Sequence, residues 1–302
     1  PLITSPLYPR LQAAGAVFGS KLGWERPNWF APPGVPARDE YSMGRQNWFG
    51  HVGNEHAQVR SHAGLFDQSS FAKFEVTGRD AAVDLDRICA GNVLQMPVGR
   101  LVYTQLLNNR GGIEADLTVA RLSDGLFSVV TGTGFRTHDF GWIKDHLGSG
   151  SEIHDVTEDW GTLSLMGPRA RDILARVTRH AVDNDSMPFG TARVIDLAGV
   201  PVRALRVTYV GELGWELHVP IARLGEVHDA LMAADPLLRP VGYRALESLR
   251  LEKGYRAWSS DITPNDTPFE AGLSWAVKMK SGRDFIGRPA LERAANAAPA
   301  KR

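Results

Sequence analysis

The sequence has a single cysteine among 302 residues, and this scarcity restricts both its stabilisation and its chemistry. A lone Cys89 permits neither an internal disulfide nor a metal site built from several thiolates. It lies in an apolar segment, 85–93, which predicts a thiol kept in a reducing compartment. We therefore expect the protein in the cytoplasm, or in the mitochondrial matrix if its source is eukaryotic.

An excess of either charge is also missing, because 34 basic residues balance 34 acidic ones. No overall field would draw the chain onto nucleic acid or an anionic membrane. Apolar runs of the roughly 18 residues that a membrane helix needs are absent as well. We therefore expect small-molecule or protein partners, no nucleic acid and no membrane. A composition of 43% hydrophobic and 23% charged residues predicts a globular chain with length for about two domains.

Several signatures of catalysis are lacking. Gly132-Thr133-Gly134 has no third glycine of a dinucleotide fingerprint, and no Gly-x-Ser-x-Gly nucleophile elbow occurs. His51 and His56 do not have the i, i+4 spacing of a zinc-binding helix. Hydride transfer and serine hydrolysis therefore lose support from the sequence, and we expect no metal.

The chain begins at Pro1 without an initiator methionine and ends in an Ala-rich tail, 294–302. It shows no leader at its start and no closing strand or cap at its end, so we expect further sequence on both sides. A helix is predicted over 7–18, and three prolines within 31–36 oppose both helix and strand. We interpret 1–45 as an arm and linker from a preceding domain.

The rest of the sequence repeats one phrase. Segments 74–85 and 163–174 each read as a strand, a glycine turn and a helix. Alternating strands follow each copy, and then an amphipathic helix over 141–147 or 224–233. Chance recurrence of a common phrase is the alternative. The pattern predicts an α+β protein of two related α/β units with antiparallel sheets, at 46–150, opening with a helix over 48–59, and at 151–302.

A predicted hairpin over 103–120 carries the first candidate residue. Its turn, Asn-Asn-Arg-Gly-Gly, joins two alternating runs. In the second run Asp116 shares a strand face with Glu114 and Thr118. The tandem glycines have no Cβ atoms and let a flat ligand or another strand approach the backbone closely. A solvated strand face is the alternative interpretation.

A second stretch, 208–219, again joins two runs through glycines and carries Glu216 at a similar offset from its turn. Carboxylates from two equivalent hairpins can face one cavity, where one accepts hydrogen bonds from a polar heterocycle and the other handles a proton. Segment 244–255 reads as a helix with a glycine cap, and Arg244 or Arg250 can clamp an anionic tail. Ordinary ion pairs on the helix are the alternative for each arginine.

Together these stretches resemble the glycine-cleavage T-protein (aminomethyltransferase) superfamily. The resemblance rests on Gly-Gly-x-x-x-Asp-Leu within 103–117, on 209–216 and 244–254, and on Asp-Phe-Ile-Gly-Arg at 284–288. It extends from about residue 59 to 291. The flanking segments 5–30 and 255–258 are similar to the folate-binding C-terminal half of dimethylglycine and sarcosine dehydrogenases and oxidases.

The resemblance implies a cloverleaf of two α/β units around a central tetrahydrofolate cavity, here lacking its C-terminal β-barrel. By motif position it assigns Asp116 as the catalytic aspartate beside folate N10, and Glu216 as the carboxylate that binds the pterin ring. The other cofactor-binding residues that it implies are Tyr103 and Tyr209 along the cavity, Arg244 toward the glutamate tail, and Arg250, which alternatively only braces its helix.

The implied activity is one-carbon transfer to tetrahydrofolate. An iminium or formaldehyde from the oxidation of an N-methyl amine would be captured as 5,10-methylenetetrahydrofolate. FAD for that oxidation is expected only in a separate domain absent from this chain, and a flavin-containing amine oxidase or dehydrogenase half is the expected partner. Two alternatives remain: a folate-dependent S- or O-demethylase of the same superfamily, and a non-catalytic folate-binding module.

Overall fold

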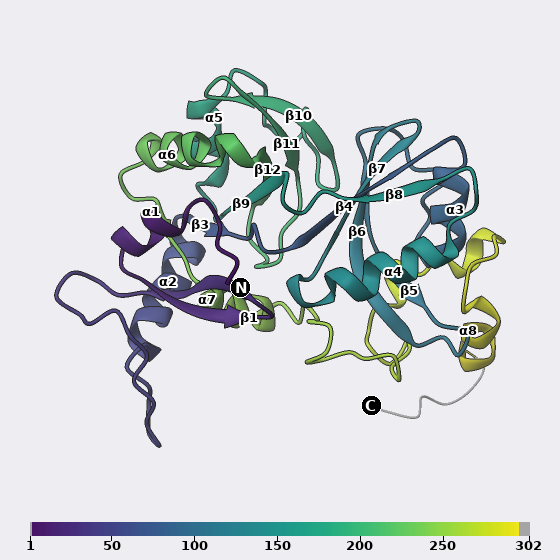
Figure 1. The fold of residues 1–302 in the computed structure, drawn as a ribbon, viewed down its shortest axis with the longest axis horizontal. Helices are drawn as coiled ribbons and strands as arrows, with labels where there is room; N and C mark the ends of the chain where they lie inside the picture. Colours follow the sequence, from purple (N-terminus) through teal and green to yellow (C-terminus); the bar gives the residue numbers. More distant parts are fainter. Residues whose placement is uncertain (1, 296–302) are drawn as a thin grey trace. The chain divides into compact units, whose positions relative to one another are not determined.

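The computed structural model describes residues 2–295, and these divide into two compact units, each formed by two chain segments (Figure 1). The first unit comprises the described residues up to Ser70 together with Thr157–Tyr255. The second comprises Phe71–Val156 and the described residues from Arg256 onward. These divisions do not coincide with the predicted boundaries after residues 45 and 150, because each unit recruits a segment that is distant in sequence. Within residues 2–295 no helix is long and apolar enough to cross a membrane.

The first unit is built around a six-stranded sheet. Its strands are β3 (Gly64–Asp67), β9 (Trp160–Met166), β10 (Ala192–Leu197), β11 (Val200–Leu205), β12 (Gly214–Pro220) and β13 (Arg239–Pro240), and β1 (Ala16–Lys21) and β2 (Trp24–Phe30) form a separate hairpin. Its helices are α1 (Tyr8–Ala13), α2 (Phe49–Ser61), α5 (Ala170–Val177), α6 (Leu224–Ala234) and α7 (Tyr243–Glu252). The strand order is β10-β11-β12-β9-β3-β13, and only the β3–β13 pair is parallel.

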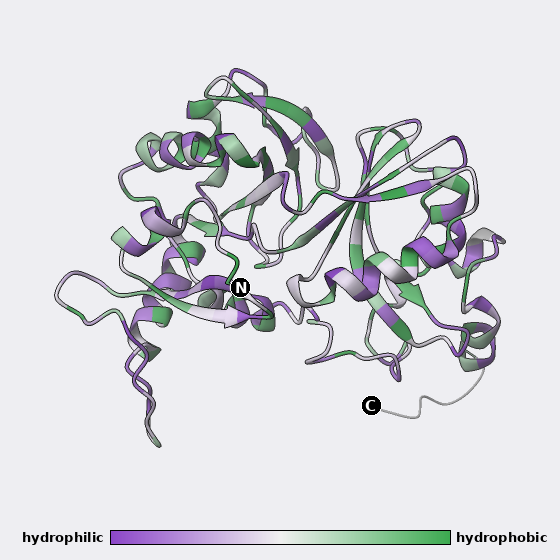
Figure 2. Ribbon diagram, viewed as in Figure 1, coloured by the Kyte–Doolittle hydropathy of each residue, from purple (hydrophilic) through white to green (hydrophobic). Residues whose placement is uncertain are grey.

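This sheet has one apolar and one more polar face. Leu163 and Leu165 of β9 and Leu217 of β12 are fully buried in one cluster with side chains of α5 and α6. Burying a leucine side chain contributes about 1.5–3 kcal/mol. The intervening Ser164 and Glu216 face the other side, because successive side chains of a strand point to opposite faces. Figure 2 shows that α6, which covers the apolar face, carries both hydrophobic and hydrophilic residues.

The second unit contains a five-stranded antiparallel sheet in the order β5-β6-β7-β4-β8. Its strands are β4 (Ala72–Thr77), β5 (Leu101–Leu107), β6 (Ile113–Ser123), β7 (Leu126–Thr131) and β8 (Glu152–Asp155), and its helices are α3 (Ala81–Ile88), α4 (Arg136–His146) and α8 (Arg288–Ala295). Ala115 and Leu117 of β6 are buried in a cluster with Leu85 of α3 and Ile143 of α4. Cys89 is fully buried in the same cluster, in keeping with its apolar segment.

The two sheets confirm the predicted repeat. Each unit contains the same series of strand, helix, three strands and helix: β4, α3, β5, β6, β7, α4 in one unit, and β9, α5, β10, β11, β12, α6 in the other. In both sheets the last strand of the series pairs with the first, β7 with β4 and β12 with β9. Gly78, between β4 and α3, and Gly167, between β9 and α5, occupy corresponding turns and have φ angles of +127° and +136°. Glycine adopts this conformation without the steric penalty of a Cβ atom. The repeated phrase in the sequence therefore encodes a repeated topology.

The predicted hairpin over 103–120 is confirmed by β5 and β6. The helices predicted over 48–59, 141–147, 224–233 and 244–255 are confirmed as α2, α4, α6 and α7, with shifted ends. At the end of α7, Gly254 has φ of +65° and its N–H donates to the carbonyl of Leu251 at 2.9 Å. The glycine cap predicted for this helix is therefore present.

The predicted helix over 7–18 is wrong in its second half, because α1 ends at Ala13 and β1 begins at Ala16. Gly15 between them has φ of +89°, and a Cβ atom there would lie 2.2 Å from the carbonyl oxygen of Ala31. The glycine thus allows the chain to turn and β1 to pair with β2.

Glu55 of α2 connects the N-terminal hairpin to α7. Its Oε1 accepts a hydrogen bond from the backbone N–H of Phe30 at 2.6 Å, and its Oε2 accepts one from Gly242 at 2.7 Å. Burial raises the pKa of Glu55 to about 7, although both hydrogen bonds favour the ionised form. The connection therefore depends on a carboxyl group whose charge changes near neutral pH.

Stability should decrease as the pH rises from about 4.5 to about 7, because only the folded protein keeps the Glu55 proton in that range. The contribution is on the order of 3 kcal/mol, from the shift between the ordinary and the raised pKa. Glu55→Gln should lose this contribution, which denaturant unfolding at several pH values would measure. Glu152→Gln, at an exposed site, should keep the wild-type slope; a Glu55→Gln slope equal to wild type would contradict the prediction.

Candidate functional site

The hairpin of β5 and β6 brings together two of the predicted site residues, Tyr103 and Asp116. Both lie on the face of the sheet opposite the apolar cluster, because Tyr103 pairs with Thr118 and Gln105 pairs with Asp116 in the register of the two strands. The Tyr103 hydroxyl donates to Asp116 Oδ2 at 2.8 Å. The ring of Trp275 stacks on Tyr103 with 5.7 Å between centroids. The stacked rings of Tyr103 and Trp275 therefore lie next to the carboxylate of Asp116, which Tyr103 binds.

The surroundings of Asp116 favour its protonated form. Burial raises the pKa of Asp116 to about 6, even though the Tyr103 hydroxyl stabilises the ionised carboxylate. The negative charge of Asp139 raises it further. Within residues 2–295 no basic side chain forms an ion pair with Asp116. A carboxyl group that titrates near neutral pH is suited to general acid and base catalysis.

Gln105, directly across the ladder from Asp116, is completely buried. Neither its Nε2 nor its Oε1 forms a hydrogen bond with any residue that the structure describes. A buried polar group left without a partner costs about 1–3 kcal/mol. This face of the sheet therefore holds a donor and an acceptor, next to Asp116, that the described protein does not satisfy.

A further group of ionisable side chains in the same unit was not predicted. Asp139 of α4, 1% exposed, accepts a hydrogen bond from Thr131 Oγ1 at 2.5 Å and lies 2.8 Å from His138 Nδ1. His138 Nε2 is 3.7 Å from Glu114 Oε2, and Glu114 Oε1 accepts a hydrogen bond from Asn108 Nδ2 at 2.8 Å. Burial also raises the pKa of Asp139. The sequence signal was only an adjacent His-Asp pair, because the contacts with β6 and β7 are tertiary.

The tandem glycines of the hairpin turn accommodate the chain itself. A Cβ atom on Gly112 would lie 1.8 Å from the carbonyl oxygen of Pro264. The Trp258 indole donates to the carbonyl of Ile113 at 2.9 Å, immediately after the turn. The close approach at Gly112 is therefore made by another segment of the second unit, and the glycines are no evidence for a flat ligand.

Glu216 lies half-buried on β12, where it pairs with Ser164 of β9 and Leu205 of β11. The expectation of a hairpin over 208–219 is wrong, because β11 ends at Leu205 and β12 begins only at Gly214. In the repeat β12 corresponds to β7, whereas Asp116 lies on β6. The two carboxylates therefore do not occupy equivalent hairpin positions.

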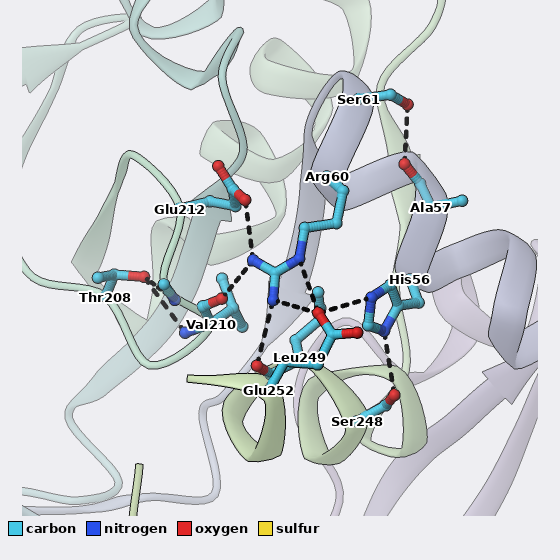
Figure 3. Close-up of polar contacts among 11 residues, drawn as sticks. His56, Ala57, Arg60, Ser61, Thr208, Val210, Glu212, Ser248, Leu249 and Glu252 are labelled. Atoms are coloured by element: carbon cyan, nitrogen blue, oxygen red, sulfur yellow. Dashed lines mark hydrogen bonds and ion pairs between the residues drawn. The ribbon is translucent and has the colours of Figure 1, made fainter. Parts of the chain in front are cut away.

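The loop that carries Tyr209 is held by Arg60 of α2 (Figure 3). Arg60 Nη1 donates to the carbonyl of Val210 and to Glu212 Oε1, both at 2.8 Å. Its Nη2 donates to Glu252 Oε2 of α7 at 2.9 Å. Because one guanidinium group binds both the loop and α7, the position of Tyr209 depends on the packing of these two elements.

The side chain of Arg250 is buried, with 2% of its surface exposed, and its contacts are with other residues of the first unit. It donates from Nη1 to the carbonyl of Tyr255 at 2.9 Å and forms an ion pair with Glu247. The Tyr255 ring stacks on Tyr209 with 6.1 Å between centroids. These contacts are of the kind expected for the bracing role that was the alternative for Arg250, and they connect the end of α7 with Tyr209. Binding of a ligand by Arg250 stays a prediction.

Arg244 forms a bidentate ion pair with Asp39, with Nη1–Oδ1 and Nη2–Oδ2 distances of 2.8 and 2.7 Å. Its guanidinium carbon lies 3.6 Å from the ring centroid of Trp48. The hydrogen bonds from Arg244 lower the pKa of Asp39, and the Trp29 indole donates to the same carboxylate. An anionic ligand tail would therefore compete with Asp39 for Arg244.

The predicted site residues thus fall into two groups, and their meeting in one cavity stays a prediction. Tyr103 and Asp116 belong to the second unit, and Tyr209, Glu216, Arg244 and Arg250 belong to the first. Across residues 2–295 no three His, Cys, Asp or Glu side chains are grouped so that they could hold a metal ion.

Known proteins resemble this chain over most of its length. The family model of the GCVT N-terminal domain matches residues 7–281. Mitochondrial dimethylglycine dehydrogenase of Mus musculus is 37% identical over 293 residues, covering 95% of this chain and 33% of the relative. Mitochondrial sarcosine dehydrogenase of Homo sapiens is 38% identical over 331 residues, covering 95% of this chain and 36% of the relative. The chain thus spans about a third of the length of these relatives.

The crystal structure of the glycine cleavage system aminomethyltransferase T from Bartonella henselae has the same fold. It superimposes with a TM-score of 0.84 at 29% sequence identity. The match covers 99% of this chain and 76% of that protein.

Tyr103→Phe should raise the pKa of Asp116 above its value of about 6. The variant removes the one side-chain hydrogen bond to the ionised carboxylate, whereas burial and the Asp139 charge remain. The Asp116 carboxyl carbon shift, followed by NMR during a pH titration, measures the change. Tyr8→Phe, in the other unit, should leave the titration unchanged. An unchanged or lower pKa in Tyr103→Phe would show that the hydroxyl does not bind Asp116.

Proposed function

The chain belongs to the family of the GCVT N-terminal domain, and from this premise we propose that it transfers one-carbon units to tetrahydrofolate. Its fold is that of an aminomethyltransferase, and its relatives include dimethylglycine and sarcosine dehydrogenases. The observation that carries the proposal is the half-buried Asp116, hydrogen-bonded to Tyr103 and raised in pKa to about 6. Such a carboxyl group can both give and take a proton near neutral pH.

The side chains present suit a reduced folate. The faces of its pterin ring can stack on aromatic rings, and Tyr103 and Tyr209 are the side chains to which we assign this role. The edge of the ring presents N–H groups, and a carboxylate such as Glu216 can accept them in pairs. The amine N10 requires a group that exchanges protons, and Asp116 is assigned this part.

In the proposed reaction N5 and N10 of the folate would each lose a proton and bond to the incoming carbon. The oxygen of formaldehyde would leave as water, or, when an iminium is the donor, its nitrogen would leave as the demethylated amine. Asp116 orients the N10 amine and accepts its proton as the nitrogen–carbon bond forms. Tyr103 keeps the carboxylate in position by holding its Oδ2. The product is 5,10-methylenetetrahydrofolate. Holding both reactants in one site removes much of the entropic cost of their encounter.

The one-carbon unit is proposed to come from an N-methyl amine. The named relatives are dehydrogenases of dimethylglycine and sarcosine, and this chain spans about a third of their length. Oxidation of such an amine yields an iminium, or formaldehyde after hydrolysis. We assign that oxidation to a flavin-containing half that is the partner of this chain, and the capture of the carbon to the residues described here.

Asp116→Asn should slow the formation of 5,10-methylenetetrahydrofolate by roughly 10²–10⁴-fold, the range for a positioned acid or base. The amide has nearly the same shape but cannot take up the proton, so folding and most of the folate affinity should be kept. The rate is measured during amine oxidation by the flavin-containing partner, with the folate product identified by mass spectrometry. A 5-methyl product would favour a demethylase instead.

Glu114→Gln is the matched control, because Glu114 is the nearest other carboxylate of β6, two residues before Asp116, and it lies beside His138. It should reduce the rate far less than Asp116→Asn. His138→Gln tests the same side of the site, since His138 lies between Glu114 and Asp139. Wild-type transfer by Asp116→Asn, together with a failure of Glu114→Gln or His138→Gln, would move the proton transfer from Asp116 to these groups.

Glu216→Ala should weaken tetrahydrofolate binding by about 1–3 kcal/mol, because buried N–H groups of the ring would lose their acceptor. Calorimetric titration of wild type and variant measures the difference. Arg193→Ala, at an exposed position of β10, should bind folate as the wild type does. Equal affinities for Glu216→Ala and wild type would remove Glu216 from the site. Folate binding by the wild type without turnover would favour a binding module over an enzyme.

A further inference from the structure

Two arginines of the first unit meet at one buried tryptophan. Arg171 of α5 and Arg206, which follows β11, place their guanidinium carbons 5.9 and 4.8 Å from the ring centroid of Trp215. Trp215 lies on β12 among the apolar residues that pack against α5 and α6. Glu216, the next residue, points to the opposite face of the sheet. The two arginines therefore lie on the other face of the sheet from Glu216, the residue proposed to bind folate.

The acceptors that bind the two guanidinium groups are all neutral. Asn184 Oδ1 accepts from Arg171 Nη2 at 2.6 Å and from both Nη1 and Nη2 of Arg206 at 3.3 Å. The backbone carbonyls of Val182 and Met187 accept from Arg171 Nε and Arg206 Nη1 at 3.0 and 2.7 Å. Within residues 2–295 neither arginine has an ion pair with a carboxylate.

This arrangement leaves positive charge uncompensated in a mostly buried place. Arg206 is only 8% exposed. Burial lowers its pKa, and the charge of Arg171 lowers it further. A mostly buried guanidinium group without a carboxylate partner is unfavourable, because neutral acceptors and the Trp215 ring replace only part of the solvation that it loses. The two arginines therefore repel one another at a site where an anion would stabilise both.

Donors also outnumber acceptors in this cluster. A guanidinium group has five N–H donors, yet Arg206 Nε and Arg171 Nη1 form no hydrogen bond with a described residue. The indole N–H of Trp215, on a fully buried side chain, has no acceptor within the described part of the chain either. Asn184 Oδ1 already shows one oxygen bound by both guanidinium groups. An oxyanion can supply several such oxygens.

We propose that Arg171 and Arg206 form a binding site for a dianionic oxyanion of the phosphate type. Two fixed positive charges match a dianion better than the single charge of a carboxylate, and each guanidinium fork can bind a pair of phosphate oxygens. The site needs no folate and no Asp116, so it stands independently of the proposed function. Free phosphate and the phosphate group of a larger metabolite share this chemistry.

Arg171→Gln is the test variant, because Arg171 is only half-buried and its loss leaves the Arg206 contacts with Met187 in place. Inorganic phosphate is titrated into the whole chain by calorimetry at constant ionic strength. Wild type should bind phosphate, and Arg171→Gln should bind it roughly 10- to 100-fold more weakly, as expected for the loss of charged hydrogen bonds. Arg193→Gln makes the same charge change at an exposed position of β10 and should keep the wild-type affinity.

Thermal unfolding separates binding from a purely structural role. If the arginines serve only to hold the loop around Asn184, Arg171→Gln lowers the melting temperature equally with and without phosphate, and the proposal fails. It fails as well if wild type binds no phosphate, or if Arg171→Gln and wild type bind it equally. Glycerol phosphate is the second ligand. Tighter binding of this ester than of phosphate identifies the headgroup of a metabolite as the ligand, and the reverse identifies the free ion; both support the site.

Discussion

The alternation of side chains along antiparallel strands is the constraint on which both units depend. In β6, Ala115 and Leu117 enter the apolar cluster with α3 and α4, and Asp116 between them therefore faces the other side. A slip of one residue would bury the Asp116 carboxylate in the core and expose the apolar side chains. The hydrophobic core thus fixes the position of Asp116, and the bond from Tyr103 then adjusts its orientation and its pKa.

The repeated topology did not produce two copies of one site. The pair of residues on β12 and β9 is Glu216 with Ser164, and the corresponding pair on β7 and β4 is Ser128 with Glu75. Carboxylate and hydroxyl have exchanged strands between the copies. Asp116 lies one strand further along, on β6. The two units therefore have the same topology but carry different polar residues at corresponding positions. For this reason the similar offsets of Asp116 and Glu216 from glycine turns led to a wrong prediction for segment 208–219.

What could be predicted from the sequence was local. The hairpin of Asp116 follows from alternation and turn residues that are adjacent in the chain, so its register and the face of Asp116 were predictable. The division into units was not, because Gly64–Asp67 joins a sheet whose other strands begin only at Trp160. The Asp139 group was missed for the same reason: Thr131 and Glu114 reach it only after the sheet and α4 have packed.

The charged groups of the protein differ in whether they have a partner of opposite charge, and this difference separates groups that stabilise the fold from groups that we propose bind a ligand. Arg60, Arg244 and Arg283 are each matched by carboxylates, and buried Glu55 by two backbone N–H groups. Asp116 has only a hydroxyl and a like charge nearby, and Arg206 has only neutral acceptors and a like charge. The chain has equal numbers of acidic and basic residues, so a shortage of opposite charges does not explain why Asp116 and Arg206 have no ion-pair partner. Because a poorly solvated group without an opposite charge is unfavourable, these are the two positions at which we propose that a ligand binds.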